Sequence, residues 1–218
     1  MINYSHIDAV LEVIGTIAFA SSGAIVGIRK QMDIFGVIVL AVVTALGGGC
    51  TRDIILGIMP PNMFMNSTYA IQSVICAIIL FMIFYFIKDF ATSEFLKKYE
   101  EVMIVLDAIG LGAFTVTGMN TAMMLGYTDK KFLLIFVGMV TGIGGGIIRD
   151  IFSDSVPFVF KEQIYAVASF IGAVFYIMFK DILNPDILMI LTAIIVFVVR
   201  MVSVHKNLQL PKINIDSM

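Results

Sequence analysis

Seven long apolar stretches alternate with short polar segments along the 218-residue chain. A helix needs about 20 mainly apolar residues to cross a hydrocarbon core about 30 Å thick. Lipid offers the backbone no hydrogen-bond partners, and the alternating short strands of a membrane barrel are not evident, so each stretch is predicted to be a helix. The predicted spans are residues 7–28, 34–58, 68–87, 102–125, 132–152, 164–179 and 187–204.

The composition supports an all-α integral membrane protein. Hydrophobic residues make up 60% of the chain and charged residues 14%, whereas soluble domains contain about 45–50% and about 25%. The net charge of −2 and the absence of a basic run argue against a nucleic-acid partner, and the expected partner is the lipid bilayer. The two histidines, His6 and His205, stand near opposite ends of the chain. We therefore predict neither an enzyme nor a bound cofactor.

Basic residues are distributed unequally between the two faces of the membrane. With seven spans, one face receives the first, third and fifth connections and the C-terminus, and the positive-inside rule makes this face cytoplasmic. The N-terminus is then predicted outside, in a prokaryotic plasma (inner) membrane. The cytoplasmic basic residues are Arg29, Lys30, Lys88, Lys97, Lys98, Lys161, Arg200, Lys206 and Lys212, against Lys130, Lys131 and Lys180 on the other face.

The chain contains an internal repeat. Residues 11–19 match residues 106–114 at an offset of 95, and residues 44–54 match residues 141–151 at an offset of 97. Each copy holds three spans, and because three is odd the second copy must cross the membrane in the opposite direction. We predict an inverted three-helix repeat in residues 1–92 and 93–182, with a seventh helix and cytoplasmic tail in residues 183–218.

Both copies carry three successive glycines inside their second span. Glycine is a poor helix former, and paired interruptions near the middle of the bilayer are typical of transport sites. We expect an unwound turn at each triplet, whose freed backbone carbonyls at Gly47, Gly48, Gly144 and Gly145 coordinate a monovalent cation. The alternative is close helix packing through small residues. The two triplets are Gly47, Gly48 and Gly49, and Gly144, Gly145 and Gly146.

Ionisable residues lie within the spans, where they usually have functional roles. Arg52-Asp53 and Arg149-Asp150 follow the two triplets at equivalent positions. Glu12 is predicted at the depth of Arg52, and Asp107 at the depth of Arg149. We expect two pseudo-symmetric ion pairs, Glu12 with Arg52 and Asp107 with Arg149, one toward each mouth of a pathway.

Small hydroxyl side chains are secondary candidates for lining this pathway, although Ser and Thr in helices often bond only to their own backbone. The candidates are Ser21, Ser22, Thr44, Thr117 and Thr141.

The residues resemble a known family. Residues 19–30, Asp33, residues 36–37 and residues 44–53 are similar to the prokaryotic branch of the trimeric intracellular cation (TRIC) channels, bacterial proteins also described as the glycine-transporter-domain family. The resemblance extends over about residues 7–204 and includes the doubled Gly-Gly-Gly-x-x-Arg-Asp. It implies seven helices, a homotrimer with one pore inside each protomer, and conduction of monovalent cations such as K⁺ or Na⁺, with the triplets kinking two helices around the pore.

The sequence is compatible with two functions. One is a passive cation channel, and the other is a carrier for glycine or another small zwitterion that works by alternating access between the two repeats.

Overall fold

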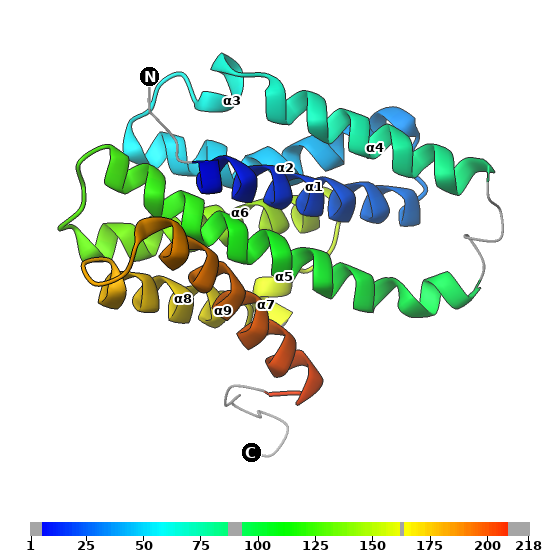
Figure 1. Ribbon diagram of the computed structural model, residues 1–218. Helices are drawn as coiled ribbons and strands as arrows, with labels where there is room; N and C mark the ends of the chain where they lie inside the picture. The colour runs from blue at the N-terminus through cyan, green and yellow to red at the C-terminus, as the bar shows by residue number, and fades with distance from the viewer. Residues whose placement is uncertain (1–5, 87–92, 162–163, 209–218) are drawn as a thin grey trace, which may run out of the picture.

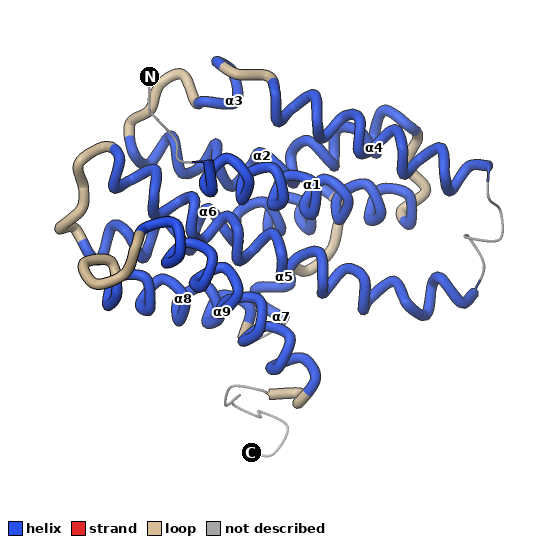
Figure 2. The backbone as a smooth tube through the Cα atoms, viewed as in Figure 1, coloured by secondary structure: helices blue, strands red, loops and turns tan. Residues whose placement is uncertain are grey.

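The computed structural model describes residues 6–86, 93–161 and 164–208, and helices are the regular secondary structure in these ranges (Figures 1 and 2). Lys88 and Lys212, used above for the orientation, lie outside the described residues. The helices are α1 (His6–Arg29), α2 (Ile34–Leu56), α3 (Asn62–Met65), α4 (Thr68–Phe86), α5 (Ser93–Met124), α6 (Lys131–Phe152), α7 (Phe158–Lys161), α8 (Tyr165–Phe179) and α9 (Pro185–His205).

The prediction of an all-helical membrane fold is confirmed. Within the described ranges, α1, α2, α4, α5, α6 and α9 are each long and apolar enough to cross a membrane. Helix α8 is apolar but has only 15 residues, about 22 Å at 1.5 Å per residue. The short helices α3 and α7 follow α2 and α6 at equivalent places in the two repeats.

Helix α5 extends beyond the predicted span. Its apolar, membrane-spanning part, Glu101–Met124, agrees with the predicted residues 102–125, but the helix itself already begins in the charged stretch at Ser93. Glu and Lys are good helix formers, so a polar segment readily extends an apolar helix. Tyr99 in this extension packs with Val26 of α1 and Leu40 of α2, and the Arg29 guanidinium lies 4.2 Å from its ring centre. Burial raises the pKa of Tyr99.

The two repeats are inverted with respect to each other. In Figure 1, α1 and α5 run in opposite directions, as do α2 and α6. These four helices form the centre of the molecule, with α4 packed on α1 and α2, and α8 and α9 packed on the second repeat. The outward side of α4 is apolar, with Ile71, Ile75 and Ile79 exposed, as expected for a surface that faces lipid.

A pair of equivalent phenylalanines marks the centre of the repeat. Phe19 of α1 and Phe114 of α5 are 95 residues apart, and their rings meet edge to face with centroids 5.2 Å apart. Each ring lies against the glycine one turn before its partner, Phe114 against Gly15 and Phe19 against Gly110. The pseudo-twofold relation of the sequence is therefore also a relation between packed side chains.

The expected unwound turns at the glycine triplets are absent, and this prediction is wrong. Helices α2 and α6 continue without interruption through Gly47–Gly49 and Gly144–Gly146. The carbonyls expected to coordinate a cation therefore belong to continuous helices. A helix can tolerate three glycines when tertiary packing compensates for their low propensity.

The triplets instead let α2 and α6 cross with their backbones in contact. A Cβ atom added at Gly48 would overlap the carbonyl oxygen of Thr141, and one at Gly145 would overlap the carbonyl oxygen of Thr44. The position of a Cβ at Gly144 lies 3.0 Å from the Cα of Gly48. The alternative of close packing through small residues is thus the one observed.

We predict that Gly48→Ala and Gly145→Ala lower thermal stability, because overpacking against backbone atoms that cannot move typically costs about 1–3 kcal/mol. Gly49→Ala is the matched control, since its Cβ would have only the Arg52 guanidinium nearby, at 3.7 Å. The melting temperature of detergent-solubilised protein measures the difference. A control variant as unstable as Gly48→Ala would contradict the packing role.

Candidate functional site

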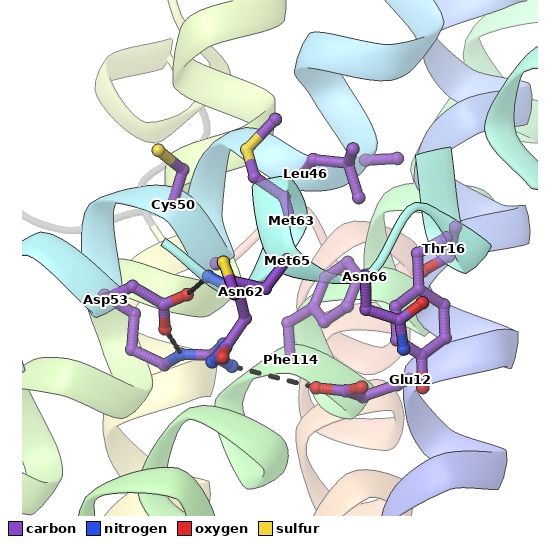
Figure 3. A pocket seen from close by; sticks show the side chains of 14 residues that line it. Glu12, Thr16, Leu46, Cys50, Asp53, Asn62, Met63, Met65, Asn66 and Phe114 are labelled. Atoms are coloured by element: carbon purple, nitrogen blue, oxygen red, sulfur yellow. Dashed lines mark hydrogen bonds and ion pairs between the residues drawn. The ribbon is translucent and has the colours of Figure 1, made fainter. Parts of the chain in front are cut away.

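The first charge cluster joins α1 and α2. Arg52 Nη1 lies 3.8 Å from Glu12 Oε1, and Arg52 Nε donates to Asp53 Oδ1 at 2.9 Å. The second oxygen of Asp53 accepts a hydrogen bond from the backbone N–H of Asn62 at 2.8 Å, at the start of α3. Figure 3 shows Glu12 and Asp53 reaching the same guanidinium from opposite sides.

The second charge cluster repeats this plan in α5 and α6. Arg149 Nη1 donates to Asp107 Oδ1 at 2.5 Å, and Arg149 Nε donates to Asp150 Oδ1 at 2.8 Å. Asp150 Oδ2 accepts from the backbone N–H of Phe158 at 2.8 Å, at the start of α7. Arg149 Nη1 also donates to the hydroxyl of Ser22, which belongs to the first repeat.

Both predicted ion pairs are confirmed as contacts, but the distance between the charged groups differs. The Asp107–Arg149 pair is in direct hydrogen-bond contact and both residues are at most 1% exposed, whereas the Glu12–Arg52 pair is at the outer limit of an ion pair. Asp53 and Asp150 were predicted to be embedded charges, and the structure adds that each holds its arginine and a short helix. The third glycine of each triplet, Gly49 or Gly146, leaves room beside the guanidinium.

Two cavities accompany the clusters. The first, here called the Glu12 cavity, has a volume of about 200 Å³ and contains both acids and Arg52 of the first cluster (Figure 3). The second, called the Arg29 cavity, has a volume of about 470 Å³ and is lined by Arg29, Lys30 and Asp150, together with Tyr99. Arg149 and Asp107 line neither cavity, because they are covered by packed side chains.

Packed side chains separate the two cavities. Thr16 lines the Glu12 cavity and Val26 lines the Arg29 cavity, and ten helical residues span about 15 Å. Between them on α1, Phe19 and Ser22 are fully buried, against Phe114 and the Arg149 cluster respectively. These two contacts therefore lie between the levels of the two cavities along α1.

The candidate hydroxyls have different roles. Thr44 and Thr141 donate to the carbonyls four residues earlier in their own helices, at 2.5 and 2.6 Å, and Ser21 contacts the Cys76 thiol at 3.2 Å. Ser22 belongs to the Arg149 cluster. Thr117, its equivalent at offset 95, is fully buried, and its hydroxyl has no hydrogen-bond partner among the described residues.

Three residues near the clusters were not identified as candidates from the sequence. Tyr69 hydrogen-bonds to Glu12, and its equivalent Tyr165 is 1% exposed beside the second cluster. Their match at offset 96 was the available signal. Arg200, counted above as a cytoplasmic charge, is 2% exposed, with its guanidinium 5.3 Å from the Tyr165 ring centre. Nothing in the apolar pattern of α9 distinguishes it from an exposed terminal basic residue.

In the described part of the chain, no group of three or more His, Cys, Asp or Glu side chains is arranged to hold a metal ion. The clusters instead pair carboxylates with guanidinium groups inside an apolar bundle, and ionisable groups within membrane helices usually mark a functional site.

Comparisons with known proteins agree on one family. A family model described as glycine transporter matches twice, over residues 9–85 and 104–181. The UPF0126 membrane protein of Deinococcus radiodurans is 39% identical over 165 residues, 75% of this chain and 72% of the relative. The UPF0126 inner membrane protein YadS of Escherichia coli K12 is 30% identical over 94% of this chain and 96% of its own length.

Solved structures show the same fold. A prokaryotic TRIC channel crystallised in KCl is 32% identical, with a TM-score of 0.82 over 94% of this chain and 98% of that one. The TRIC trimeric intracellular cation channel orthologue from Rhodobacter sphaeroides is 27% identical, with a TM-score of 0.82 over 94% of this chain and 100% of that one.

The two ion pairs differ in distance and burial, so we predict that they contribute differently to the stability of the protein. Arg149→Met leaves two buried carboxylates without their guanidinium, which typically costs about 3–5 kcal/mol. Arg52→Met should cost less, because the first cluster borders a cavity that water can enter. Thermal unfolding in detergent compares the two variants, and an equal or larger loss for Arg52→Met would contradict this difference.

Proposed function

We propose that this chain, which belongs to the glycine-transporter-domain (UPF0126) family, is a membrane channel for monovalent cations such as K⁺ or Na⁺. The observation that carries the proposal is its similarity to solved prokaryotic TRIC channels, at 32–33% identity over 94–95% of the chain. Both repeats and the seventh helix lie within that similarity.

The proposed pathway runs inside one protomer, from the Glu12 cavity past Phe19 and the Arg149 cluster to the Arg29 cavity. Buried charges arranged in pseudo-symmetric clusters support it, because ionisable groups within membrane helices usually line a polar path. In the Glu12 cavity, Glu12 and Asp53 supply two carboxylates against one guanidinium. This excess of negative charge raises the local concentration of cations.

The proposed orientation places the Arg29 cavity at the cytoplasmic face of a plasma membrane. Arg29 and Lys30 are exposed at the end of α1, where the positive-inside rule expects basic residues. The Glu12 cavity is then open to the outside. The Escherichia coli relative, described as an inner membrane protein, supports the same localisation.

We also propose a homotrimer. The Rhodobacter sphaeroides protein with the same fold is described as trimeric, and the wide apolar faces of this chain have room for both lipid and neighbouring protomers. The mass of the detergent-solubilised complex measured by light scattering tests it, and a monomer or dimer as the main species contradicts it.

A carrier for glycine or another small zwitterion is the second candidate. The description of the matching family model as a glycine transporter favours it, and so does the presence of an arginine and carboxylates in one cavity, which can pair with the carboxylate and ammonium groups of an amino acid. A carrier exposes its site alternately to the two sides and passes no continuous current.

Purified protein in planar bilayers separates the two functions. A channel produces unitary currents whose reversal potential follows the K⁺ gradient. Saturable glycine uptake into proteoliposomes without unitary currents would establish the carrier and contradict the channel.

For the channel, we predict that Glu12→Gln reduces cation conductance, because it removes a negative charge from the mouth of the pathway. The reduction should be largest at low salt, where the screening length is about 30 Å at 0.01 M. Asp181→Asn is the matched control, since this carboxylate is 82% exposed and far along the chain from the cavity. Equal conductances of Glu12→Gln and Asp181→Asn across the salt series would contradict the role of Glu12.

A further inference from the structure

Equivalent residues of the two repeats have different hydrogen-bond partners. In the second repeat, Asp107 accepts a hydrogen bond from Ser22 at 2.9 Å, across the boundary between the repeats. The Tyr165 hydroxyl is buried there and, among the described residues, has no hydrogen-bond partner, and neither has Asp107 Oδ2. Asp107 is thus bonded to a hydroxyl of the opposite repeat rather than to the tyrosine of its own.

The first repeat shows the opposite choice. Glu12, the equivalent of Asp107, is hydrogen-bonded to Tyr69, the equivalent of Tyr165. Thr117, the equivalent of Ser22, has its buried hydroxyl left without a partner among the residues described. Glu12 is thus bonded to the tyrosine of its own repeat rather than to the hydroxyl of the opposite one.

The unused partners are close to the acids. Ser22 bonds to Asp107 and Gly15 lies against Phe114. Because α1 and α5 are antiparallel, the same register brings Glu12 and Thr117 to the same level. On the other side, a Cβ at Gly146 would lie 3.2 Å from the Tyr165 hydroxyl and 3.9 Å from Arg149 Nη2. The tyrosine therefore lies beside the guanidinium that Asp107 contacts.

Unpaired buried hydroxyls are costly, so a native structure that keeps them needs a reason. Here both orphaned hydroxyls, Thr117 and Tyr165, stand at positions whose symmetry mates are bonded. Inverted repeats of this kind allow one sequence to adopt two arrangements in which the halves exchange conformations. A hydroxyl that is unpaired in one arrangement then has its partner in the other.

We infer that each acid is a two-position latch, closed when it bonds the hydroxyl of the opposite repeat and open when it bonds the tyrosine of its own. The Glu12 latch consists of Glu12, Thr117 and Tyr69, and the Asp107 latch consists of Asp107, Ser22 and Tyr165. In this structure the Glu12 latch is open and its cavity exists, while the Asp107 latch is closed and buried.

This inference rests on the proposed pathway and assigns its gate. Opening requires Asp107 and Arg149 to leave Ser22, which frees the contact between the two repeats, and the Tyr165 hydroxyl then donates to Asp107. Ser22, Thr117, Tyr69 and Tyr165 are positioning residues, because they set where the acids and arginines lie.

The symmetry also supplies a reporter for the state of each latch. Thr16, although only 2% exposed, lines the Glu12 cavity, whereas its equivalent at offset 95, Leu111, lines neither cavity and packs in one cluster with Tyr165 of the Asp107 latch. When the Asp107 latch opens, residue 111 should become accessible to water. Single cysteines at these two positions, in a Cys50→Ser, Cys76→Ser background, report each latch through their rate of reaction with a membrane-impermeant maleimide in nanodiscs.

We expect variants of the Asp107 latch to change the Leu111→Cys reaction rate in opposite directions. Ser22→Ala removes the closed-state partner of two charged groups and should raise the rate about tenfold, since hydrogen bonds to charged groups are the stronger ones. Tyr165→Phe removes only the open-state partner and should lower it. Thr121→Val is the control, because Thr121 is a buried hydroxyl that donates to its own helix, and it should leave the rate unchanged.

Variants of the Glu12 latch provide the mirror test with Thr16→Cys. Tyr69→Phe removes the partner that Glu12 has in this structure and should lower the Thr16→Cys rate, and Thr117→Val should not lower it. If Ser22→Ala and Tyr165→Phe change the Leu111→Cys rate in the same direction, or leave it unchanged while folded protein is recovered, the latch is contradicted.

The maleimide reaction rate does not depend on ion transport, so the latch and the proposed channel function are tested independently. If Ser22→Ala raises and Tyr165→Phe lowers the reaction rate of Leu111→Cys, but no unitary K⁺ currents are observed, the latch is supported and the proposed channel is contradicted. If unitary currents are observed but neither Ser22→Ala nor Tyr165→Phe changes their open probability, the latch is contradicted and the proposed channel stands.

Discussion

A guanidinium group buried in a membrane protein must be compensated by carboxylates, and Arg149 shows how much of this structure follows from that requirement. It has no exposed surface and is held by Asp107, Asp150 and Ser22, from three different helices. Removing a buried charge's partner costs far more than a surface ion pair contributes. The positions of α1, α5 and α6 near one face of the bundle are therefore tied to a single side chain.

The duplication gives the molecule this arrangement twice, once in each direction. Arg52 and Arg149 each follow a glycine triplet, each is held by the acid next to it in the sequence, and each of those acids also binds the first N–H of a short helix. The copies differ in how tightly the acid on the neighbouring helix, Glu12 or Asp107, is held, in its hydroxyl partner and in what covers it. That difference accounts for the open Glu12 cavity on one side and the buried Asp107 on the other.

The sequence predicted the fold and the charged pairs because both leave strong local signals. Span length and apolar content indicated the helices, and the offsets of 95–97 residues indicated the inverted repeat. The pairing of Glu12 with Arg52 followed from their similar depth. The state of the glycine triplets could not be predicted, because whether glycines break a helix or allow a close crossing depends on the neighbouring backbone, here Thr141 against Gly48 and Thr44 against Gly145. Arg200 was also missed, since its burial depends on Tyr165 of another helix.

The central claim is that cations pass through the interior of one protomer, between the two charge clusters. Anomalous scattering from crystals grown with Tl⁺ in place of K⁺ measures this most directly, because it locates the permeant ion without altering the protein. The account predicts anomalous density in the Glu12 cavity within reach of the Glu12 and Asp53 carboxylates. Density confined to the interface between protomers, with none inside the bundle, would contradict it.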